Sequence, residues 1–451
     1  MKSLSLLPLL FAAGLSLPQG TSPSSLVLRA GDKHHATTVT PGTIKDVKVT
    51  KFNTLNGTHV EAGTVSHNAF SANAGPLRID LVNNIGGSDQ GYAYIVGKDS
   101  SNRIAFVRED GRLNYVTAGA DGTLKPVADD AGIVLGAPGA TKGVTLTQTL
   151  TSARVYFSAG KLQFFVQRDA STGQDALVQP DPGNKSDPNA AINWGFVEFT
   201  HTDDGQVYAN LSFVDFVGLP ASMKLTSADK PEQLVQAMPR GSLGSLQGAI
   251  QSAEASDKVG WTNLIYQLDG KVVRIVSPNI YNQQDPTVFA TYFDEYVTRV
   301  WNGLRFEPGL TVDSQGTDGK IKCKVSNDVL ECDKGLKYKK PTSADIFSCN
   351  TGPFAPSGND LRQNVGARLC AAFVRTTFNV AGGKVQPGPD ASKYYTEKRT
   401  HYYAKSIHDI EVDGKGYAFQ YDDVHPTGGV DASGTVQASQ PQVLTFYAGG
   451  I

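Results

Sequence analysis

Charged residues are scarce in this chain of 451 residues. They make up 19% of it, and 41 lysines and arginines nearly balance 43 aspartates and glutamates. A soluble domain usually carries about 25% charged residues. The formal net charge of −2 gives no electrostatic reason to expect a nucleic acid as partner, because that binding depends on neutralising phosphates. The composition also excludes a coiled coil and a disordered charged tail.

Several common catalytic motifs are missing as well. The sequence contains no G-x-S-x-G elbow, no Walker A loop, no H-E-x-x-H zinc motif and no strand-borne G-x-G-x-x-G. Its eight histidines are scattered, and the one adjacent pair, His34 and His35, lies in a polar stretch. We therefore expect no metal and no organic cofactor. Carboxylates remain as the groups that could perform chemistry.

Long hydrophobic runs are limited to the start of the chain. Lys2 is followed by the apolar run LSLLPLLFAAGLSL, which is too short and too proline-interrupted for a membrane span of about 20 residues. The pattern is typical of a secretory signal peptide over residues 1–20, with a cleavage site between Gly14 and Gly20. A buried N-terminal helix is the alternative. The C-terminus lacks the hydrophobic tail of a GPI signal, so we expect a secreted protein with no membrane partner.

Cysteine is rare, and all four cysteines fall within a window of 48 residues. An even number in a secreted chain predicts two disulfides. Of the three pairings, we favour Cys323–Cys332, which would close a small loop between two short strands, together with Cys349–Cys370. A zinc site is less favoured because the cysteines form no C-x-x-C pair and have no neighbouring histidine.

Three sequons, at Asn56, Asn184 and Asn210, predict a glycoprotein. Asn210 lies inside a strand-like run, which makes it a poor acceptor. Glycans on the other two would agree with the secretion that the N-terminus predicts.

Glycine and proline are abundant, at 47 and 23 residues, and indicate many turns. Up to about residue 225, short strand-like runs alternate with turn signals, which predicts an antiparallel sandwich or barrel. Gly160, inside the run over residues 153–167, indicates a hairpin turn. The runs cover residues 77–84, 91–97, 103–109, 153–167, 194–200 and 206–220.

Helical periodicity appears after residue 225. Helix-like stretches alternate with strand-like pieces such as 271–277, and two further strand-like runs follow at 416–424 and 442–448. We predict a β-barrel over residues 21–225, a mixed α/β insertion with both disulfides over 226–397, and C-terminal strands over 398–451 that complete the barrel. The predicted helices cover residues 245–253, 291–304 and 360–378.

The densest acidic and aromatic neighbourhood is residues 193–220, which predicts a hairpin turning at Asp204-Gly205. With a two-residue turn, Glu198 would lie opposite Leu211, and strand alternation would place Asp215 on the same face. Their offset would be about 13 Å at ~3.3 Å per residue. Inverting glycosidases separate their carboxyl groups by about 6.5–9.5 Å. The spacing thus permits a carboxylate pair, and solvated strand carboxylates remain the alternative.

The stretch E-F-T … N-L-S-x-V-D-F-V-G-L-P, residues 198–220, resembles the glycoside hydrolase family 64 β-1,3-glucanases, which have a thaumatin-like fold. Blocks over residues 153–165, 177–189, 345–354 and 416–424 resemble the family in the same order. The resemblance implies a mainly β protein: a thaumatin-like β-sandwich or barrel and a smaller mixed α/β domain, flanking a wide cleft.

The resemblance also implies roles for individual residues. Glu198 matches the general acid, kept protonated by aromatic neighbours, and Asp215 matches the general base of an inverting hydrolysis. Asp203 and Asp204 are interpreted as turn residues. For several of the remaining residues a structural role competes with sugar binding. The expected substrate-binding residues are Thr200, Asn210, Ser212, Asp422, Asp423, Trp194 and Tyr208.

The predicted function is a secreted, monomeric, inverting endo-β-1,3-glucanase that releases short laminari-oligosaccharides from β-1,3-glucan. The main alternative is a non-catalytic thaumatin-like protein that binds β-glucan or associates with a cell wall, since one fold hosts both activities. A structural wall protein that interacts through its insertion is a third hypothesis. The presence of both Glu198 and Asp215 in their motif favours the enzyme.

Overall fold

The computed structural model describes residues 35–59, 75–127 and 131–451. The signal peptide expected over residues 1–20 lies outside these residues. Within them, no helix has the length and apolar character needed to cross a membrane.

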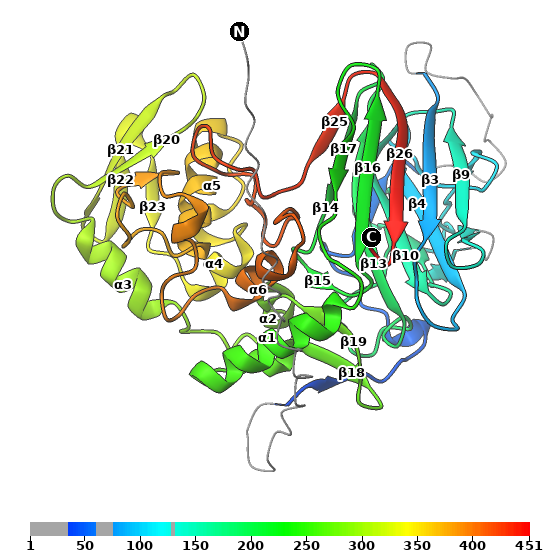
Figure 1. Ribbon diagram of the computed structural model, residues 1–451, viewed down its shortest axis with the longest axis horizontal. Coiled ribbons are helices and arrows are strands. Elements are labelled where there is room, and N and C mark those ends of the chain that lie inside the picture. The colour runs from blue at the N-terminus through cyan, green and yellow to red at the C-terminus, as the bar shows by residue number, and fades with distance from the viewer. Residues whose placement is uncertain (1–34, 60–74, 128–130) are drawn as a thin grey trace, which may run out of the picture. The chain divides into compact units, whose positions relative to one another are not determined.

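Two β-sheets pack face to face and together contain half of the described strands (Figure 1). Phe157 and Phe199 of the larger sheet each lie 6.4 Å, between ring centroids, from Phe446 of the smaller one. The smaller sheet has the order β17 (Gln233–Val235), β16 (Ala221–Ser227), β26 (Pro441–Ala448), β3 (Leu77–Asn83) and β9 (Thr141–Leu146). The larger has the order β25 (Val436–Ala438), β14 (Val207–Leu211), β13 (Asn193–His201), β10 (Leu150–Ala159), β4 (Gly91–Lys98), β5 (Ile104–Val107) and β6 (Leu113–Tyr115), and β8 (Ile133–Val134) also pairs with β4.

Both sheets keep two edges along their described strands, so neither closes on itself. The fold is a β-sandwich with a mixed α/β part, and the closed β-barrel predicted for residues 21–225 and the C-terminal strands is wrong. The C-terminal strand β26 lies between β16 and β3 and runs parallel to β3, while β25 pairs with β14. The domain boundaries expected near residues 225 and 397 stay a prediction.

Strand alternation divides the side chains of the larger sheet between its two faces. Val155, Phe157, Val197 and Phe199 are buried in the sandwich core. The residues between them point to the opposite face. A four-stranded sheet covers part of that face, with Phe164, next to β11, packed 5.3 Å from Tyr156 between ring centroids. Its order is β2 (Thr54–Gly57), β12 (Asp175–Val178), β11 (Phe165–Arg168) and β7 (Lys125–Pro126).

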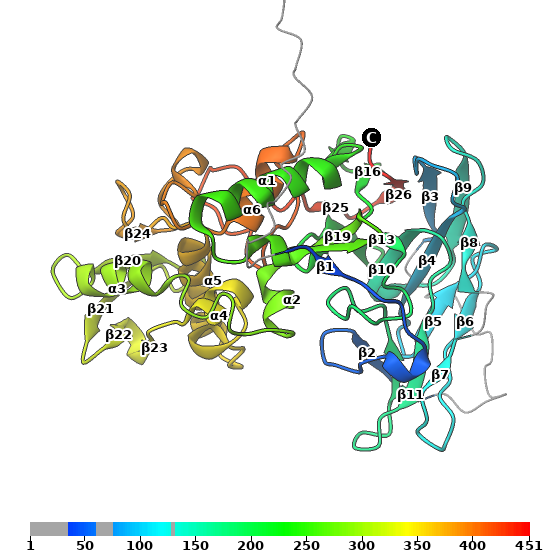
Figure 2. The same ribbon diagram turned by 90° about the horizontal axis from the view of Figure 1, so that it is seen from below.

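The mixed part contains all the described α-helices and two further sheets. Helices α1 and α6 lie side by side, as Figure 2 shows. The helices are α1 (Ser242–Asp257), α2 (Pro278–Asn282), α3 (Asp294–Gly303), α4 (Ser343–Ser348), α5 (Asp360–Val374) and α6 (Tyr402–Ile410). One sheet has the order β1 (Thr37–Thr38), β18 (Ile265–Leu268), β19 (Lys271–Val276) and β15 (Phe216–Val217), and the other β23 (Lys337–Lys339), β22 (Val329–Cys332), β21 (Lys320–Ser326), β20 (Leu310–Asp313) and β24 (Val385–Gln386).

The three helices expected from periodicity are confirmed as α1, α3 and α5, with shifted bounds. The strand expected over residues 416–424 is wrong. Only an isolated bridge between Ser212 and Tyr417 forms there, because the Asp422 carboxylate accepts the backbone N–H groups of Ala418 and Phe419 and folds the segment into a turn. The expected hairpin at Gly160 is also wrong, since β10 and β11 belong to different sheets.

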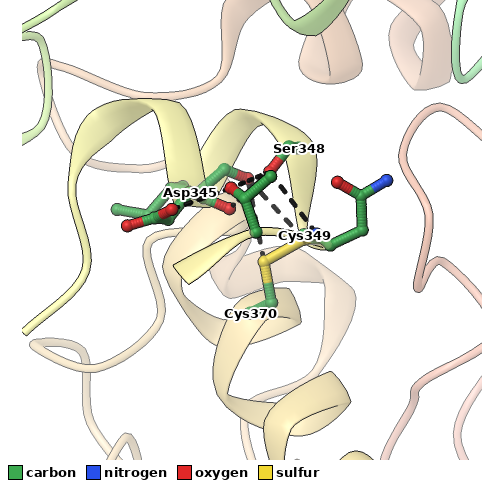
Figure 3. The surroundings of a disulfide bond; sticks show 7 residues. Asp345, Ser348, Cys349 and Cys370 are labelled. Carbon is green, nitrogen blue, oxygen red and sulfur yellow. Dashed lines mark hydrogen bonds between the residues drawn. A yellow bond between two sulfur atoms is a disulfide. The ribbon is translucent and has the colours of Figure 1, made fainter. Parts of the chain in front are cut away.

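Both expected disulfides are confirmed. Cys323–Cys332 joins directly paired positions of β21 and β22, and Cys349–Cys370 ties the end of α4 to α5 (Figure 3). Beside the second bond, a capping box fixes the start of α4: Thr342 accepts the N–H of Asp345, and the Asp345 carboxylate accepts the N–H of Thr342.

The sequons differ in their surroundings. Asn56 is exposed on β2, and Asn210 lies on β14. Asn184 is 2% exposed, and its amide donates to the backbone oxygen of Asp46 at 2.9 Å. A glycan on Asn184 would therefore break this buried contact, which leaves Asn56 as the accessible acceptor.

Candidate active site

The hairpin of β13 and β14 carries most of the expected site residues. It turns through three residues, closed by a hydrogen bond from the Thr202 N–H to the Gln206 oxygen at 2.9 Å, and Gly205 takes the left-handed conformation with φ of 83°. The two-residue turn inferred from the sequence is therefore wrong. The register pairs Glu198 with Asn210 instead of Leu211.

This register places four expected residues on one face, whereas the two-residue turn would have put Tyr208 and Asn210 on the other face. Glu198 lies opposite Asn210, and Thr200 lies opposite Tyr208. Because side chains alternate along a strand, all four point away from the sandwich core. Asp203 and Asp204 lie in the turn, where Asp203 accepts a hydrogen bond from Thr149 at 2.6 Å.

Asp215 reaches the site by a different route from the one that strand alternation suggests. Strand β14 ends at Leu211, and the chain bends before β15 pairs with β19 in another sheet. The backbone oxygen of Asp215 accepts the N–H of Ser277 at 2.8 Å, which anchors the bend. The expected extended offset between Glu198 and Asp215 is wrong, because the strand does not continue to Asp215.

Arg154 is paired with Glu198 and its charge acts on Asp215, and sequence reasoning missed it. It lies directly opposite Glu198 in the ladder of β10 and β13, and its Nε and Nη2 donate to Glu198 Oε1 at 3.1 and 3.0 Å. Its charge also acts on Asp215. The available signal was an arginine that alternates with buried residues in the block 153–165.

Neighbouring groups fix the Arg154 side chain. Its guanidinium lies over the ring of Phe196, 4.3 Å from the centroid, and its Nη1 donates to Gln179 Oε1 at 3.1 Å. The hydroxyl of the buried Tyr156 donates to the same oxygen. Arg154 therefore has little freedom to leave Glu198.

Burial raises the pKa of Asp215 to about 6. The charge of Arg154 works against this rise, whereas the negative charges of Glu198 and Asp181 add to it. Charges on Glu198 and Asp215 thus act on each other, as expected for two carboxyl groups that share one site.

A polar pocket of about 470 Å³ opens over Glu198. Thr200, Tyr208 and Asn210 line it, as expected for substrate-binding residues, and the Asn210 side-chain oxygen has no hydrogen-bond partner among the described residues. The rest of the lining is Lys51, Phe52, Thr54, Leu55, Val96, Ser152, Ala153, Arg154, Gln179 and Phe199.

The other expected site residues lie apart from this pocket. Trp194 is 1% exposed and packs against Tyr156 and Phe216, so it belongs to the core and cannot stack on a sugar. Ser212 is half-buried at the bridge with Tyr417.

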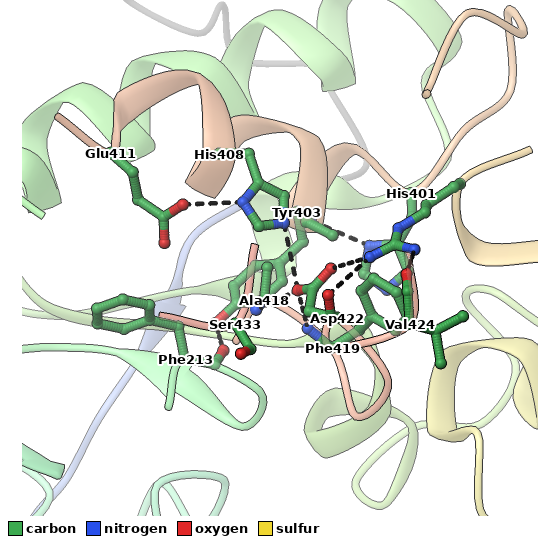
Figure 4. A network of polar contacts seen from close by, with 12 residues as sticks. Phe213, His401, Tyr403, His408, Glu411, Ala418, Phe419, Asp422, Val424 and Ser433 are labelled. Atoms are coloured by element: carbon green, nitrogen blue, oxygen red, sulfur yellow. Dashed lines mark hydrogen bonds and ion pairs between the residues drawn. The ribbon is translucent and has the colours of Figure 1, made fainter. Parts of the chain in front are cut away.

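Asp422 is completely buried, and its expected contact with substrate is wrong. It accepts hydrogen bonds from Arg375 at 3.1 Å and forms an ion pair with His408 at 3.2 Å (Figure 4). Burial alone would raise the pKa of Asp422, but the charges of His408 and Arg375 hold it below its usual value. Asp422 is a structural carboxylate, and its neighbour Asp423 is exposed outside the pocket.

Comparison with known proteins decides the family. A family model described as β-1,3-glucanase, glycoside hydrolase family 64, matches residues 75–448. The chain belongs to glycoside hydrolase family 64. A glucan endo-1,3-β-glucosidase of Arthrobacter sp. (strain YCWD3) is 28% identical over 395 residues, covering 84% of this chain and 67% of the relative. One from Cellulosimicrobium cellulans is 29% identical with the same coverage.

Solved structures of family 64 agree with this assignment. A laminaripentaose-producing β-1,3-glucanase in complex with laminaritetraose is 28% identical, with a TM-score of 0.72, and the match covers 83% of this chain and 98% of that one. A β-1,3-glucanase domain from Clostridium beijerinckii, at 21% identity and a TM-score of 0.65, has the same fold, with coverage of 83% and 98%.

Proposed function

We propose that this protein is a secreted endo-acting β-1,3-glucanase that hydrolyses β-1,3-glucan to short laminari-oligosaccharides with inversion of configuration. Glu198 is the general acid and Asp215 the general base. The observation that carries the proposal is the Glu198–Arg154 pair at a polar pocket, with Asp215 near enough for the charges of both to act on it, in a chain of family 64.

The contacts of Glu198 leave one of its carboxyl oxygens open toward the pocket. Both hydrogen bonds from Arg154 go to Oε1, and Oε2 has no partner among the described residues. Oε2 can therefore carry the proton that the glycosidic oxygen receives, while Arg154 keeps the carboxyl group oriented. The unpartnered oxygen of Asn210 is available to a sugar hydroxyl in the same pocket.

The pKa of Asp215 suits the role of a general base at pH values above about 6. With a pKa of about 6, it is ionised at neutral pH and can take a proton from the attacking water. Inversion requires that water to approach the anomeric carbon from the face opposite the leaving group. The resulting product is the α-anomer.

The reaction is tested with laminarin and anomer-resolved NMR of the first products. The proposal expects α-anomeric oligosaccharides from the wild type and a loss of turnover in Glu198→Gln. If the wild type binds glucan without cleaving it, the protein is a non-catalytic glucan-binding protein instead. Release of β-anomers would exclude inversion.

A substrate with a good leaving group separates the two roles. In an aryl β-laminaribioside made with an acidic phenol, the phenolate leaves without being protonated. Glu198→Gln should therefore retain most of its activity on this substrate. Asp215→Asn should lose activity on both substrates, because the water still needs a base. The opposite pattern would exchange the two roles.

Secretion and the monomeric state are further parts of the proposal. The N-terminal pattern over residues 1–20 supports export, and an open pocket acting on a polymer needs no second subunit. Expression of the full chain with N-terminal sequencing of the protein in the medium tests the first part. Light scattering of that material tests the second.

A further inference from the structure

Residues 51–55, the N-terminal wall, lie before residue 75, where the family match begins. Lys51, Phe52, Thr54 and Leu55 nevertheless line the same pocket as Glu198. Strand β2 continues from this wall and pairs with β12. Residues outside the family match thus form one wall of the pocket over Glu198.

Asn53 anchors the N-terminal wall. It is 4% exposed, its amide donates to the backbone oxygen of Gln179 at 3.2 Å, and its own backbone oxygen accepts the Gln179 N–H at 2.8 Å. The Gln179 side chain in turn holds Arg154. The wall is therefore connected to Glu198 through Gln179 and Arg154 and has a defined position.

Two exposed aromatic rings line the pocket. Phe52 is 39% exposed on the N-terminal wall, and Tyr208 is 41% exposed on β14. The Lys51 ammonium lies 5.0 Å from the centroid of the Phe52 ring. An exposed phenylalanine beside polar groups costs hydration free energy that a ligand can recover by covering it.

We propose that the N-terminal wall is a glucan-binding element, in which Phe52 stacks on a glucosyl unit close to the scissile bond. The apolar face of a β-linked glucose presents C–H groups to an aromatic ring, while its equatorial hydroxyls reach the polar residues of the pocket. This inference rests on the proposed function, since it assumes that the pocket over Glu198 holds glucan.

The test compares Phe52→Ala with Phe306→Ala. Phe306 is 70% exposed in the turn after α3, outside the pocket lining, and provides a matched loss of an exposed ring. We expect Phe52→Ala to raise the KM for laminarihexaose about five- to tenfold with little change in kcat. Phe52→Tyr should retain wild-type KM, and Phe306→Ala should behave as the wild type.

Calorimetric binding of laminarihexaose to Glu198→Gln and to the double variant Glu198→Gln/Phe52→Ala needs no turnover. A five- to tenfold weaker affinity in the double variant supports the wall, even if the wild type does not hydrolyse glucan. Equal affinities, or equal effects of the Phe52 and Phe306 substitutions, would overturn it. Failure of the proposed function appears separately, as absence of products from the wild type.

Discussion

Replacing Arg154 tests whether its positive charge lowers the pKa of Asp215. In Arg154→Met, Glu198 loses both hydrogen bonds to Oε1 and Asp215 loses its nearby cation. An opposite charge within about 4–6 Å lowers a carboxyl pKa by about 1–3 units. The Arg154 side chain is 27% exposed, so water screens part of this effect. We therefore expect the pKa of Asp215 to rise by about one unit in Arg154→Met, at the low end of that range.

The direction in which the pH profile should move follows from the proposed role of Asp215. As the proposed base, Asp215 must be ionised, so kcat/KM should rise as the pH increases through about 6 in the wild type. Loss of the Arg154 cation raises the pKa of Asp215 further, so the acid limb should move to higher pH by about one unit. The assay is kcat/KM for laminarihexaose as a function of pH.

Arg154→Lys provides the control. It keeps the charge and loses the planar fork that reaches Glu198 through two nitrogens, so its acid limb should stay near the wild-type position while kcat falls. An acid limb that does not move in Arg154→Met would refute the electrostatic reasoning, even if activity is lost. A limb that moves in both variants by the same amount would assign the effect to geometry instead of charge.

Three further predictions concern catalysis and stability. Glu198→Gln should lower kcat on laminarin by about 10²- to 10⁴-fold with unchanged thermal unfolding, measured by reducing-sugar release and calorimetry. His408→Leu should cost about 3–5 kcal/mol of unfolding free energy in urea titrations, because it leaves the buried Asp422 and Glu411 without their shared cation; a loss below 1 kcal/mol would contradict this. In the wild type, burial alone would lower the pKa of His408, but Asp422 and Glu411 raise it to about 10. This contribution to stability should be complete below the unfolded pKa of about 6.5 and fall as the pH rises through about 10, whereas the His408→Leu variant should lack that decline in urea midpoints.

Local patterns in the sequence were sufficient for several elements. Alternation predicted β3, β4, β5 and β13, and periodicity predicted α1, α3 and α5, because each pattern reports which side of an element is buried. The two disulfides were predictable from four cysteines in a short window. The shared face of Glu198, Tyr208 and Asn210 was not predictable in this way, because the register inferred from the sequence puts Tyr208 and Asn210 on the opposite face.

Other features depended on contacts between distant segments. The bend that brings Asp215 toward Arg154 is anchored by Ser277, 62 positions further along the chain, and no local pattern announces it. Asp422 and Asp423 are equivalent in the sequence, yet one is completely buried against Arg375 and His408 and the other is exposed. Burial of a charge depends on which partners the fold supplies.

The sequence by itself determined the family and the mainly β character and supplied the two proposed carboxyl residues, because motif, alternation and cysteine spacing are properties of neighbouring residues. Only the tertiary structure decided the register of the hairpin, the position of Arg154 beside Glu198, and the N-terminal wall that carries Phe52. These depend on the pairing of β10 with β13 and of β2 with β12. Such pairings are selected by the packing of the whole chain, since a strand carries no local information about its partner.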